Sequence, residues 1–207
     1  MTAPDPAFPA TAMPDADWWH ALWPDPGAVL RALGLTPGTR AIDLCCGAGH
    51  FTAAMSEMLD GAVIGVDLDP EMLHRAGAAI KAAGAPTCPL IQADARDLPR
   101  IIPDPVDLVL IANTFHGVPD QTGLARAVAS VLKPGGRFVV INWHRLPREQ
   151  TQVLGQPRGP RSDLRMSPDD TAAAVTPAGF RHLDTVELPP WHYGAIFGLS
   201  TPTTGKG

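Results

Sequence analysis

The chain has 207 residues, of which 45% are hydrophobic, and its formal net charge at pH 7 is −5. This length suits one domain with a substantial core, but not a cofactor domain followed by a complete substrate domain. The acidic balance disfavours nucleic acid binding as the main function, because phosphate neutralisation needs clustered Lys and Arg. The first twenty residues lack the basic and apolar regions of a signal peptide, and no segment reaches the apolar length of a membrane span. We therefore expect a cytoplasmic protein that binds neither nucleic acid nor membranes.

The first predicted element is a helix over residues 18–35, in two pieces that are broken at Pro24 and Pro26. The apolar runs that follow have the lengths of alternating strands and helices. The predicted strands are 38–46, 62–68, 88–94, 106–113 and 136–143, and the predicted helices are 50–59, 70–84 and 121–132. Such alternation indicates a parallel sheet that helices cover on both faces.

The C-terminal part begins with a long polar loop, 145–165, and a predicted helix, 167–179. Two apolar runs then flank a pair of prolines, 180–188 and 191–199, and they predict an antiparallel hairpin at the edge of the sheet. We expect the chain to consist of an N-terminal leader and helical lid, a main domain and a flexible tail: 1–36, 37–200 and 201–207.

Three cysteines, Cys45, Cys46 and Cys88, are too few for a disulfide framework and favour a reducing compartment. Adjacent residues at the end of a strand point to opposite faces, and no C-x-x-C or His spacing completes a tetrahedral metal site around Cys45 and Cys46. We expect no metal, and we interpret this pair as small side chains in a crowded turn. Cys88 is interpreted as a buried strand residue.

Candidate binding residues follow the predicted strands, because the ligand of an open α/β sheet lies beyond the carboxyl ends of its strands. Gly47 and Gly49 in CCGAGH let the backbone bend and approach a ligand closely. Asp67, twenty residues after Gly47, is placed to accept hydrogen bonds from two ribose hydroxyls, and Asp94 from the amine of adenine. A nucleoside is therefore the predicted ligand.

A dinucleotide is disfavoured. Thr52 stands where the dinucleotide fingerprint requires a third glycine. A reductase also needs a proton donor such as Tyr with Lys four residues later, whereas Tyr193 is followed at that spacing by Phe197. A nicotinamide-dependent oxidoreductase is thus the weaker alternative.

Five segments occur in an order and spacing that we recognise: AIDLCCGAG, VIGVDLDPEML, QADARDLP, DLVLIANTFHGVPD and LKPGGRFVVINW. With them, residues 41–199 resemble the class I S-adenosylmethionine-dependent methyltransferases, in particular the small-molecule enzymes with a type 11 methyltransferase domain. The resemblance implies a Rossmann-like, doubly wound, seven-stranded α/β sheet, mostly parallel with an antiparallel last strand. It also implies S-adenosylmethionine as the cofactor and S-adenosylhomocysteine as the product.

The resemblance also implies which residues bind the cofactor. Asp43 and Asn113 are expected near the methionine amine, Asp67 at the ribose, Leu68 against the adenine face and Asp94 at the adenine edge. The complete set of expected cofactor-binding residues is Asp43, Gly47, Ala48, Gly49, Asp67, Leu68, Asp94, Ala95 and Asn113. One position departs from the family, which often has glycine where Cys45 stands.

His116 lies where the methyl acceptor is expected, and its ordinary pKa near 6.5 suits proton removal, so it is the catalytic candidate; a packed structural histidine is the alternative. Trp18, Trp19 and Trp23 are candidates for an aromatic lid, with core packing of their helix as the alternative. Arginines of the polar loop, Arg158, Arg161 and Arg165, are candidates for clamping an anionic acceptor, or are solvated loop charges. The expected acceptor contacts are Trp18, Trp19, Trp143, His144, Arg165 and Tyr193.

The acceptor itself is not specified by these motifs. Asn113 is followed by Thr-Phe-His, not by the Pro-Pro-Tyr of enzymes that methylate amino groups of nucleic acids or glutamine. A small-molecule acceptor is therefore expected, with protein side chains second. A protein that binds S-adenosylmethionine or its demethylated product without catalysis is the main alternative function.

Overall fold

The computed structural model describes residues 16–200, with side chains from Trp18 onward. The expected flexible tail and most of the expected leader, 201–207 and 1–15, lie outside the described residues. The α-helices are α1 Ala16–Leu22, α2 Pro26–Ala32, α3 His50–Met58, α4 Pro70–Ala82, α5 Leu98–Ile101, α6 Gln121–Val131 and α7 Pro168–Val175. The strands are β1 Ala41–Leu44, β2 Val63–Asp67, β3 Leu90–Gln92, β4 Val106–Ala112, β5 Leu132–Trp143, β6 Gln152–Val153, β7 Gln156–Pro157, β8 Phe180–Leu188 and β9 His192–Leu199.

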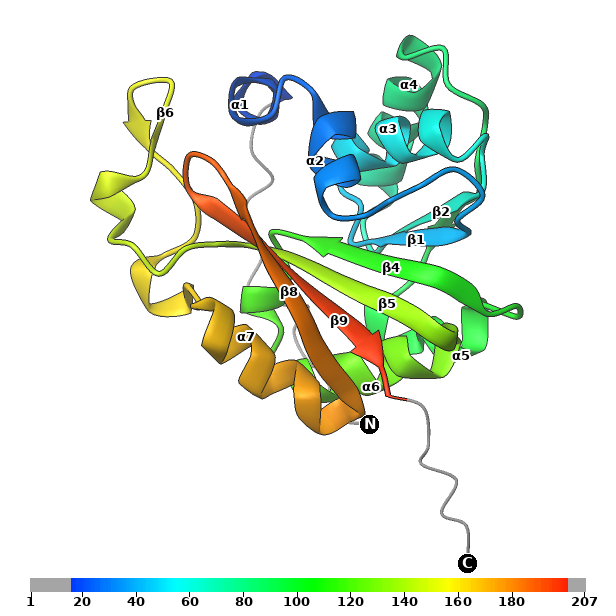
Figure 1. The fold of residues 1–207 in the computed structure, drawn as a ribbon. Coiled ribbons are helices and arrows are strands. Elements are labelled where there is room, and N and C mark those ends of the chain that lie inside the picture. Colours follow the sequence, from blue (N-terminus) through cyan, green and yellow to red (C-terminus); the bar gives the residue numbers. More distant parts are fainter. Residues whose placement is uncertain (1–15, 201–207) are drawn as a thin grey trace, which may run out of the picture.

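Seven strands form one twisted sheet in the order β3-β2-β1-β4-β5-β9-β8 (Figure 1). The strands β1 to β5 pair in parallel, whereas β9 is antiparallel to both of its neighbours, β5 and β8. The order reverses at β1, from which the sheet grows in both directions, so the crevice beyond the end of β1 is the expected ligand site. The predicted fold class is confirmed, including the terminal hairpin and the antiparallel last strand.

Helices cover both faces of the sheet, as the alternating pattern predicts. One hydrophobic core joins the sheet to α5, α6 and α7, and a second core joins it to α1, α2 and α3. In Figure 1 the helices α1 to α4 lie on one side of the sheet and α5 to α7 on the other. All four residues of β1 are buried, because this strand is covered on both faces.

Local signals define where several helices begin. The side chain of Asp69 accepts a hydrogen bond from the backbone N–H of Glu71, and Pro70 supplies the first helical residue of α4. Ser167 and Asp170 form a reciprocal capping box at the start of α7. These short polar and proline signals explain why the helix starts were readable in the sequence.

Three features differ from the expectations. The four-residue helix α5 follows β3, and the 145–165 loop contains the small antiparallel pair β6 and β7. The strand β5 begins at Leu132 rather than at 136, because Leu132 pairs with Val106 of β4 and the KPGG segment after it forms an irregularity in the strand, with a left-handed backbone at Gly135. No helix between residues 16 and 200 combines the length and the apolar character that crossing a bilayer requires.

Candidate active site

The turn between β1 and α3 is built from left-handed backbone conformations. The φ angle is 59° at Cys45, 53° at Gly47 and 83° at Gly49. A side chain at Gly49 would place its Cβ 2.7 Å from the Cα of Ala76 in α4, so only glycine fits there without moving α4. The left-handed conformation of Cys45 is one that glycine adopts more readily, which accounts for the glycine that the family often has at this position.

Of the two cysteines of the turn, Cys46 is buried and Cys45 is half-buried. Burial is the main reason why the pKa of the Cys45 and Cys46 thiols is raised, and the neighbouring carboxylates raise it further. The three cysteines are free, and residues 16–200 contain no group of three or more side chains arranged to hold a metal ion. This geometry supports the interpretation of Cys45 and Cys46 as small residues of the turn.

Asp67, at the end of β2, is held by the glycine turn. Its Oδ2 accepts a hydrogen bond from the backbone N–H of Gly47 at 2.8 Å, and its Oδ1 accepts one from the backbone N–H of Asp69 at 3.0 Å. A carboxylate has about four acceptor positions, so two remain for a ligand on the half-exposed side. Asp69 rather than Asp67 caps α4, which leaves Asp67 available for the ribose.

Asp43 is buried at the end of β1, and its Oδ2 accepts a hydrogen bond from Thr52 Oγ1 at 2.6 Å. Burial raises the pKa of Asp43 to about 7; the Thr52 hydrogen bond opposes this shift and the charge of Asp67 adds to it. A bound ammonium or sulfonium group would compensate this carboxylate. The part played by Thr52 was not visible in the sequence, where this residue only argued against a dinucleotide.

Leu68 and Asp94 lie on the predicted adenine side. The Leu68 side chain follows β2 and is 47% exposed, which is unusual for a leucine and leaves it open to contact with a ring. Asp94 caps the short turn that begins at Ala95, and its carboxylate forms an ion pair with Arg96 at 2.7 Å. The hydrogen bond from Arg96 is the main reason why the pKa of Asp94 is lowered. Asp94 is therefore a turn residue, and an adenine contact would be an additional role.

Asn113 follows β4 and is only 9% exposed, yet neither atom of its side-chain amide has a hydrogen-bond partner. Its backbone is left-handed, with φ of 59°, and its N–H donates to the carbonyl of Ile141 at 2.8 Å. Since Leu44 pairs with Ile111, the register places Asn113 beside the glycine turn. A buried amide without partners is costly, so this amide is suited to a polar ligand group.

His116 lies in a short 3-10 turn after β4 and is 6% exposed. Its Nδ1 lies 3.4 Å from Oδ1 of Asn142, whereas its Nε2 is buried without a partner. The amide oxygen of Asn142 favours the tautomer in which Nδ1 carries the proton, which leaves the lone pair on Nε2. Burial, aided by the charge of Arg165, lowers the pKa of His116, and the Asn142 contact opposes this shift.

Trp143 and Tyr193 lie at the same end of the sheet but on opposite faces. In the β5–β9 pairing Asn142 is opposite Tyr193 and Trp143 is opposite His192. Tyr193 belongs to the core under α7, where its hydroxyl bonds Thr171 at 2.7 Å, whereas Trp143 belongs to the core under α1. Of the expected acceptor contacts, Trp143 and Tyr193 therefore face different cores, and His192, which was missed, lies beside Trp143 with their ring centres 4.0 Å apart.

The tryptophans of the N-terminal helices pack over the end of β5. Trp18 stacks on Trp143 with ring centres 6.0 Å apart, Trp19 stacks on Trp23 at 5.6 Å, and Trp23 lies 4.6 Å from His192. Trp18, Trp23 and Trp143 are buried in the second core, and Trp19 packs against it. The core-packing alternative is thus present in the structure, and α1 covers this end of the sheet.

The polar loop 145–165 holds its arginines in different environments. Arg165 is 2% exposed and donates to Thr151 Oγ1 at 2.8 Å and to the carbonyls of Arg158 and Pro160 at 2.9 and 3.2 Å. Arg161 is exposed and pairs with Asp163 at 2.7 Å. His144, at the start of this loop, pairs with Glu187 at 2.9 Å and lies 5.1 Å from the ring of Tyr193. Arg165 lies over the ring of Trp143 at the end of β5, and Arg158 lies over the ring of Trp18.

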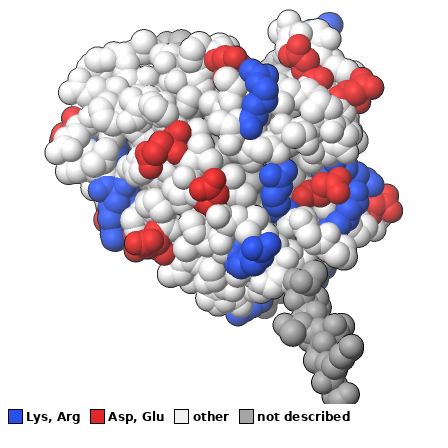
Figure 2. Space-filling view, in the orientation of Figure 1, with Lys and Arg blue, Asp and Glu red and all other residues white. Residues whose placement is uncertain are grey.

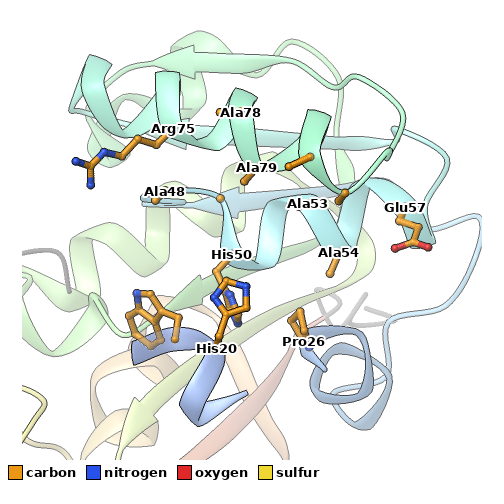
Figure 3. A pocket seen from close by; sticks show the side chains of 14 residues that line it. His20, Pro26, Ala48, His50, Ala53, Ala54, Glu57, Arg75, Ala78 and Ala79 are labelled. Atoms are coloured by element: carbon orange, nitrogen blue, oxygen red, sulfur yellow. The ribbon is translucent and has the colours of Figure 1, made fainter. Parts of the chain in front are cut away.

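A cavity of about 710 Å³ lies between α1, α3 and α4 and reaches the glycine turn (Figure 3). His20 and His50 stand next to each other at its edge, with ring centres 5.5 Å apart, and Arg75 and Glu57 lie at opposite ends. Burial and the charge of His20 lower the pKa of His50 to about 4. Its lining is Trp19, His20, Pro26, Ala48, Gly49, His50, Ala53, Ala54, Glu57, Arg75, Ala78, Ala79, Ala82 and Ala83. His50 was missed because it reads as an ordinary first residue of a helix.

The surface shows no broad basic region on the face drawn in Figure 2. Lysine and arginine side chains are interspersed with aspartate and glutamate over this face. Phosphate backbones are bound by clustered positive charges. This face therefore lacks the pattern of a nucleic acid surface.

Comparison with known proteins points to one family. Residues 41–136 match the family model described as a methyltransferase domain. Over 124 residues the chain is 34% identical to the demethylmenaquinone methyltransferase of Lactococcus lactis subsp. lactis (strain IL1403), an alignment that covers 59% of this chain and 48% of the relative. The chain thus spans about half the length of the curated relatives it matches.

Solved structures agree with this family. A SAM-dependent methyltransferase from Aquifex aeolicus superposes with a TM-score of 0.73 and 23% identity, over 89% of this chain and 94% of that one. An S-adenosylmethionine-dependent methyltransferase from Mesorhizobium loti superposes with a TM-score of 0.63 and 25% identity, over 86% of this chain and 97% of that one. The family model begins at β1 and includes the glycine turn, Asp67, Asp94 and Asn113. Residues 41–136 thus match a methyltransferase domain, and the chain has the fold of S-adenosylmethionine-dependent methyltransferases.

Proposed function

We propose that the protein binds S-adenosylmethionine beyond the carboxyl ends of β1, β2 and β4 and transfers its methyl group to a small-molecule acceptor. The observation that carries this proposal is the buried amide of Asn113, which lacks partners beside a glycine turn. The residues fit the cofactor, because the turn leaves room for close backbone approach and Asp67 keeps free acceptor positions.

The nucleoside half would be held by three groups. The carboxylate of Asp67 accepts from the two ribose hydroxyls while it holds Gly47 and Asp69. Leu68 covers one adenine face, and Asp94 with the backbone of Ala95 contacts the adenine edge. Carboxylate acceptors make the stronger kind of hydrogen bond, so Asp67 contributes most to this half.

The methionine half would meet Asp43, Asn113 and the backbone from Gly47 to Gly49. The amide oxygen of Asn113 accepts from the amino group, which satisfies its unpartnered atom. Asp43 supplies negative charge directly or through a water molecule. A nearby cation lowers the pKa of Asp43 from about 7, so this carboxylate ionises when the site is filled.

When bound, S-adenosylmethionine supplies a methyl group on a sulfonium, and the electron pair of the broken C–S bond returns to sulfur. The chain contributes alignment of the acceptor with this methyl group. His116 takes the proton of the acceptor on Nε2, because Asn142 holds its Nδ1 and its lowered pKa keeps it neutral at neutral pH. Burial around His116 keeps water from competing for the methyl group.

The acceptor is proposed to reach His116 from the end of β5, under α1 and the 145–165 loop. Relatives named demethylmenaquinone methyltransferase support a ring compound as the acceptor. The aromatic side chains of Trp18, Trp19 and Trp143 offer flat apolar surface to such a ring. We propose that 16–36 serves as the lid of a 37–200 catalytic domain, and the free cysteines support a cytoplasmic location.

Isothermal titration calorimetry tests the cofactor, with S-adenosylmethionine, S-adenosylhomocysteine and NADH titrated into the same protein. We expect binding of both sulfur nucleosides, and binding of NADH alone would overturn the proposal. A screen of ring compounds with methyl-labelled cofactor then tests the reaction. Tight cofactor binding without turnover on any acceptor would favour the alternative of a binding protein.

A further inference from the structure

Five side chains meet at the end of β5 and form what we call the Arg165 cluster: Trp18, Trp143, Arg158, Arg165 and His192. The Arg165 guanidinium carbon lies 5.1 Å from the ring centre of Trp143, and that of Arg158 lies 6.0 Å from the ring centre of Trp18. The His192 ring lies 4.0 Å from that of Trp143. The cluster thus joins α1, the 145–165 loop and the sheet.

Within residues 16–200 no carboxylate contacts the two arginines of this cluster, and only the charge of nearby Glu149 partly compensates Arg165. Arg165 is 2% exposed, and its three hydrogen bonds go to neutral oxygens: the Thr151 hydroxyl and the carbonyls of Arg158 and Pro160. Its Nη1 is buried without a partner, as is Nε of Arg158. Neither arginine forms an ion pair within the described part of the chain. A buried guanidinium without a carboxylate destabilises a fold unless another negative group binds it.

His192 adds a second unsatisfied group. It is 1% exposed, it lies between Trp23 and Trp143, and neither of its ring nitrogens has a hydrogen-bond partner. A neutral imidazole still carries one N–H donor, and a nearby anion would favour its protonated form. Arg165 and His192 both lie against Trp143, with the guanidinium carbon 5.1 Å and the imidazole centre 4.0 Å from its ring centre, so the two groups can act on one ligand.

We propose that the Arg165 cluster binds a planar organic anion, in which a conjugated ring carries a carboxylate or an ionised hydroxyl. The anion is bound by Nη1 of Arg165 and a ring nitrogen of His192, and its ring lies against Trp18 and Trp143. This inference rests on the proposed function, since the anion is the methyl acceptor or its anchoring group. The cluster lies between α1, which carries Trp18, and the 145–165 loop, which carries both arginines, at the end of β5.

Naphthoate and naphthamide are matched probes, because they share one ring system and only naphthoate is charged. We expect naphthoate to quench tryptophan fluorescence and naphthamide to bind at least about tenfold more weakly. 4-Nitrophenol tests the second type of anion and is titrated at pH values above and below the pKa of its hydroxyl. If only its ionised form binds, the site accepts ionised hydroxyls in addition to carboxylates. Equal binding of naphthoate and naphthamide, or of neither, would overturn the inference.

Substitutions locate the probe. His192→Phe keeps the ring contacts and Arg165→Gln removes the charge; each should weaken naphthoate binding about tenfold or more. Arg161→Gln, in the same loop but exposed and paired with Asp163, should leave it unchanged. If Arg165→Gln does not fold, His192→Phe decides. An equal loss in Arg161→Gln would overturn the inference as general charge attraction. Calorimetry with S-adenosylhomocysteine, the demethylated product of the cofactor, is run on the same proteins. Loss of naphthoate binding with S-adenosylhomocysteine binding retained is then distinct from failure of the proposed function.

Discussion

Removing the Asp67 carboxylate tests the cofactor site most directly, because this group faces both the glycine turn and the proposed ribose. In Asp67→Ala the two ribose hydroxyls lose a charged acceptor, at about 1.5 kcal/mol for each bond, or roughly 3 kcal/mol in all. Since 1.4 kcal/mol corresponds to tenfold in affinity, the Kd for S-adenosylmethionine should rise by about 100-fold. Titration calorimetry measures this change.

The same substitution should also lower stability. Asp67 accepts backbone hydrogen bonds from Gly47 at 2.8 Å and from Asp69 at 3.0 Å on a half-exposed side. Their loss should cost about 1 to 2 kcal/mol and lower the Tm by about 2 to 8 °C. Thermal unfolding measures this change without ligand.

Asp69→Ala is the matched control, because it removes a carboxylate two residues further on. That carboxylate caps α4 through the backbone N–H of Glu71, so its loss should cost about 1 kcal/mol of stability. The affinity for S-adenosylmethionine should stay within about twofold of the wild type. Wild-type affinity in Asp67→Ala, or an equal loss in Asp69→Ala, would refute the assignment of Asp67 to the ribose.

Three further substitutions test other parts of the site. His116→Gln should keep cofactor affinity and slow turnover by about 100-fold. It should also abolish the fall in rate as pH drops below the lowered pKa of His116. The control His182→Gln, at an exposed histidine, should leave both the turnover rate and its pH dependence unchanged. The pKa of Asp43 is raised from 3.8 to about 7 in the folded protein. As pH rises between these two values, the unfolded state loses the proton first, so the free energy of unfolding decreases. Asp43→Asn should remove this fall, which is at most roughly 4 kcal/mol by denaturant unfolding. Gly49→Ala, at φ of 83°, should lower stability by more than about 2 kcal/mol, whereas Gly84→Ala, at φ of 65° with open space around it, should cost about 1 kcal/mol.

Each of these expectations has a contrary result. An unchanged pH–rate profile in His116→Gln would make His116 a packing residue. A wild-type dependence of stability on pH in Asp43→Asn would place the titrating group elsewhere. Equal losses in Gly49→Ala and Gly84→Ala would mean that α4 can move away from the turn.

The strands and the glycine turn were readable because their signals are local. A buried apolar run, a glycine pair and an acidic residue at the next strand end occupy short stretches of sequence. Asp69 and Pro70 likewise define the start of α4 through neighbouring backbone groups. The helix α5 has only four residues, so no period could reveal it.

The acceptor side was harder to predict because it depends on register. Side chains alternate along a strand, so a shift of one residue between β5 and β9 exchanges Tyr193 with His192. The sequence alone does not specify that shift. The contacts of Arg165 with Thr151 and Trp143 depend likewise on how the polar loop folds back onto the sheet. Asn142 as the partner of His116 is separated from it by 26 residues.

The position of β9 has a consequence for the order of folding. This strand follows β8 in the chain but lies between β5 and β8 in the sheet. Until β9 is in place, β5 has an open edge, and β8 has no neighbour through which to join the sheet. Loop closure between distant segments is slow, and unpaired edges invite association with other chains. Synthesis of the last strand therefore limits when the sheet can close, and truncation before His192 should yield an aggregating protein rather than a smaller domain.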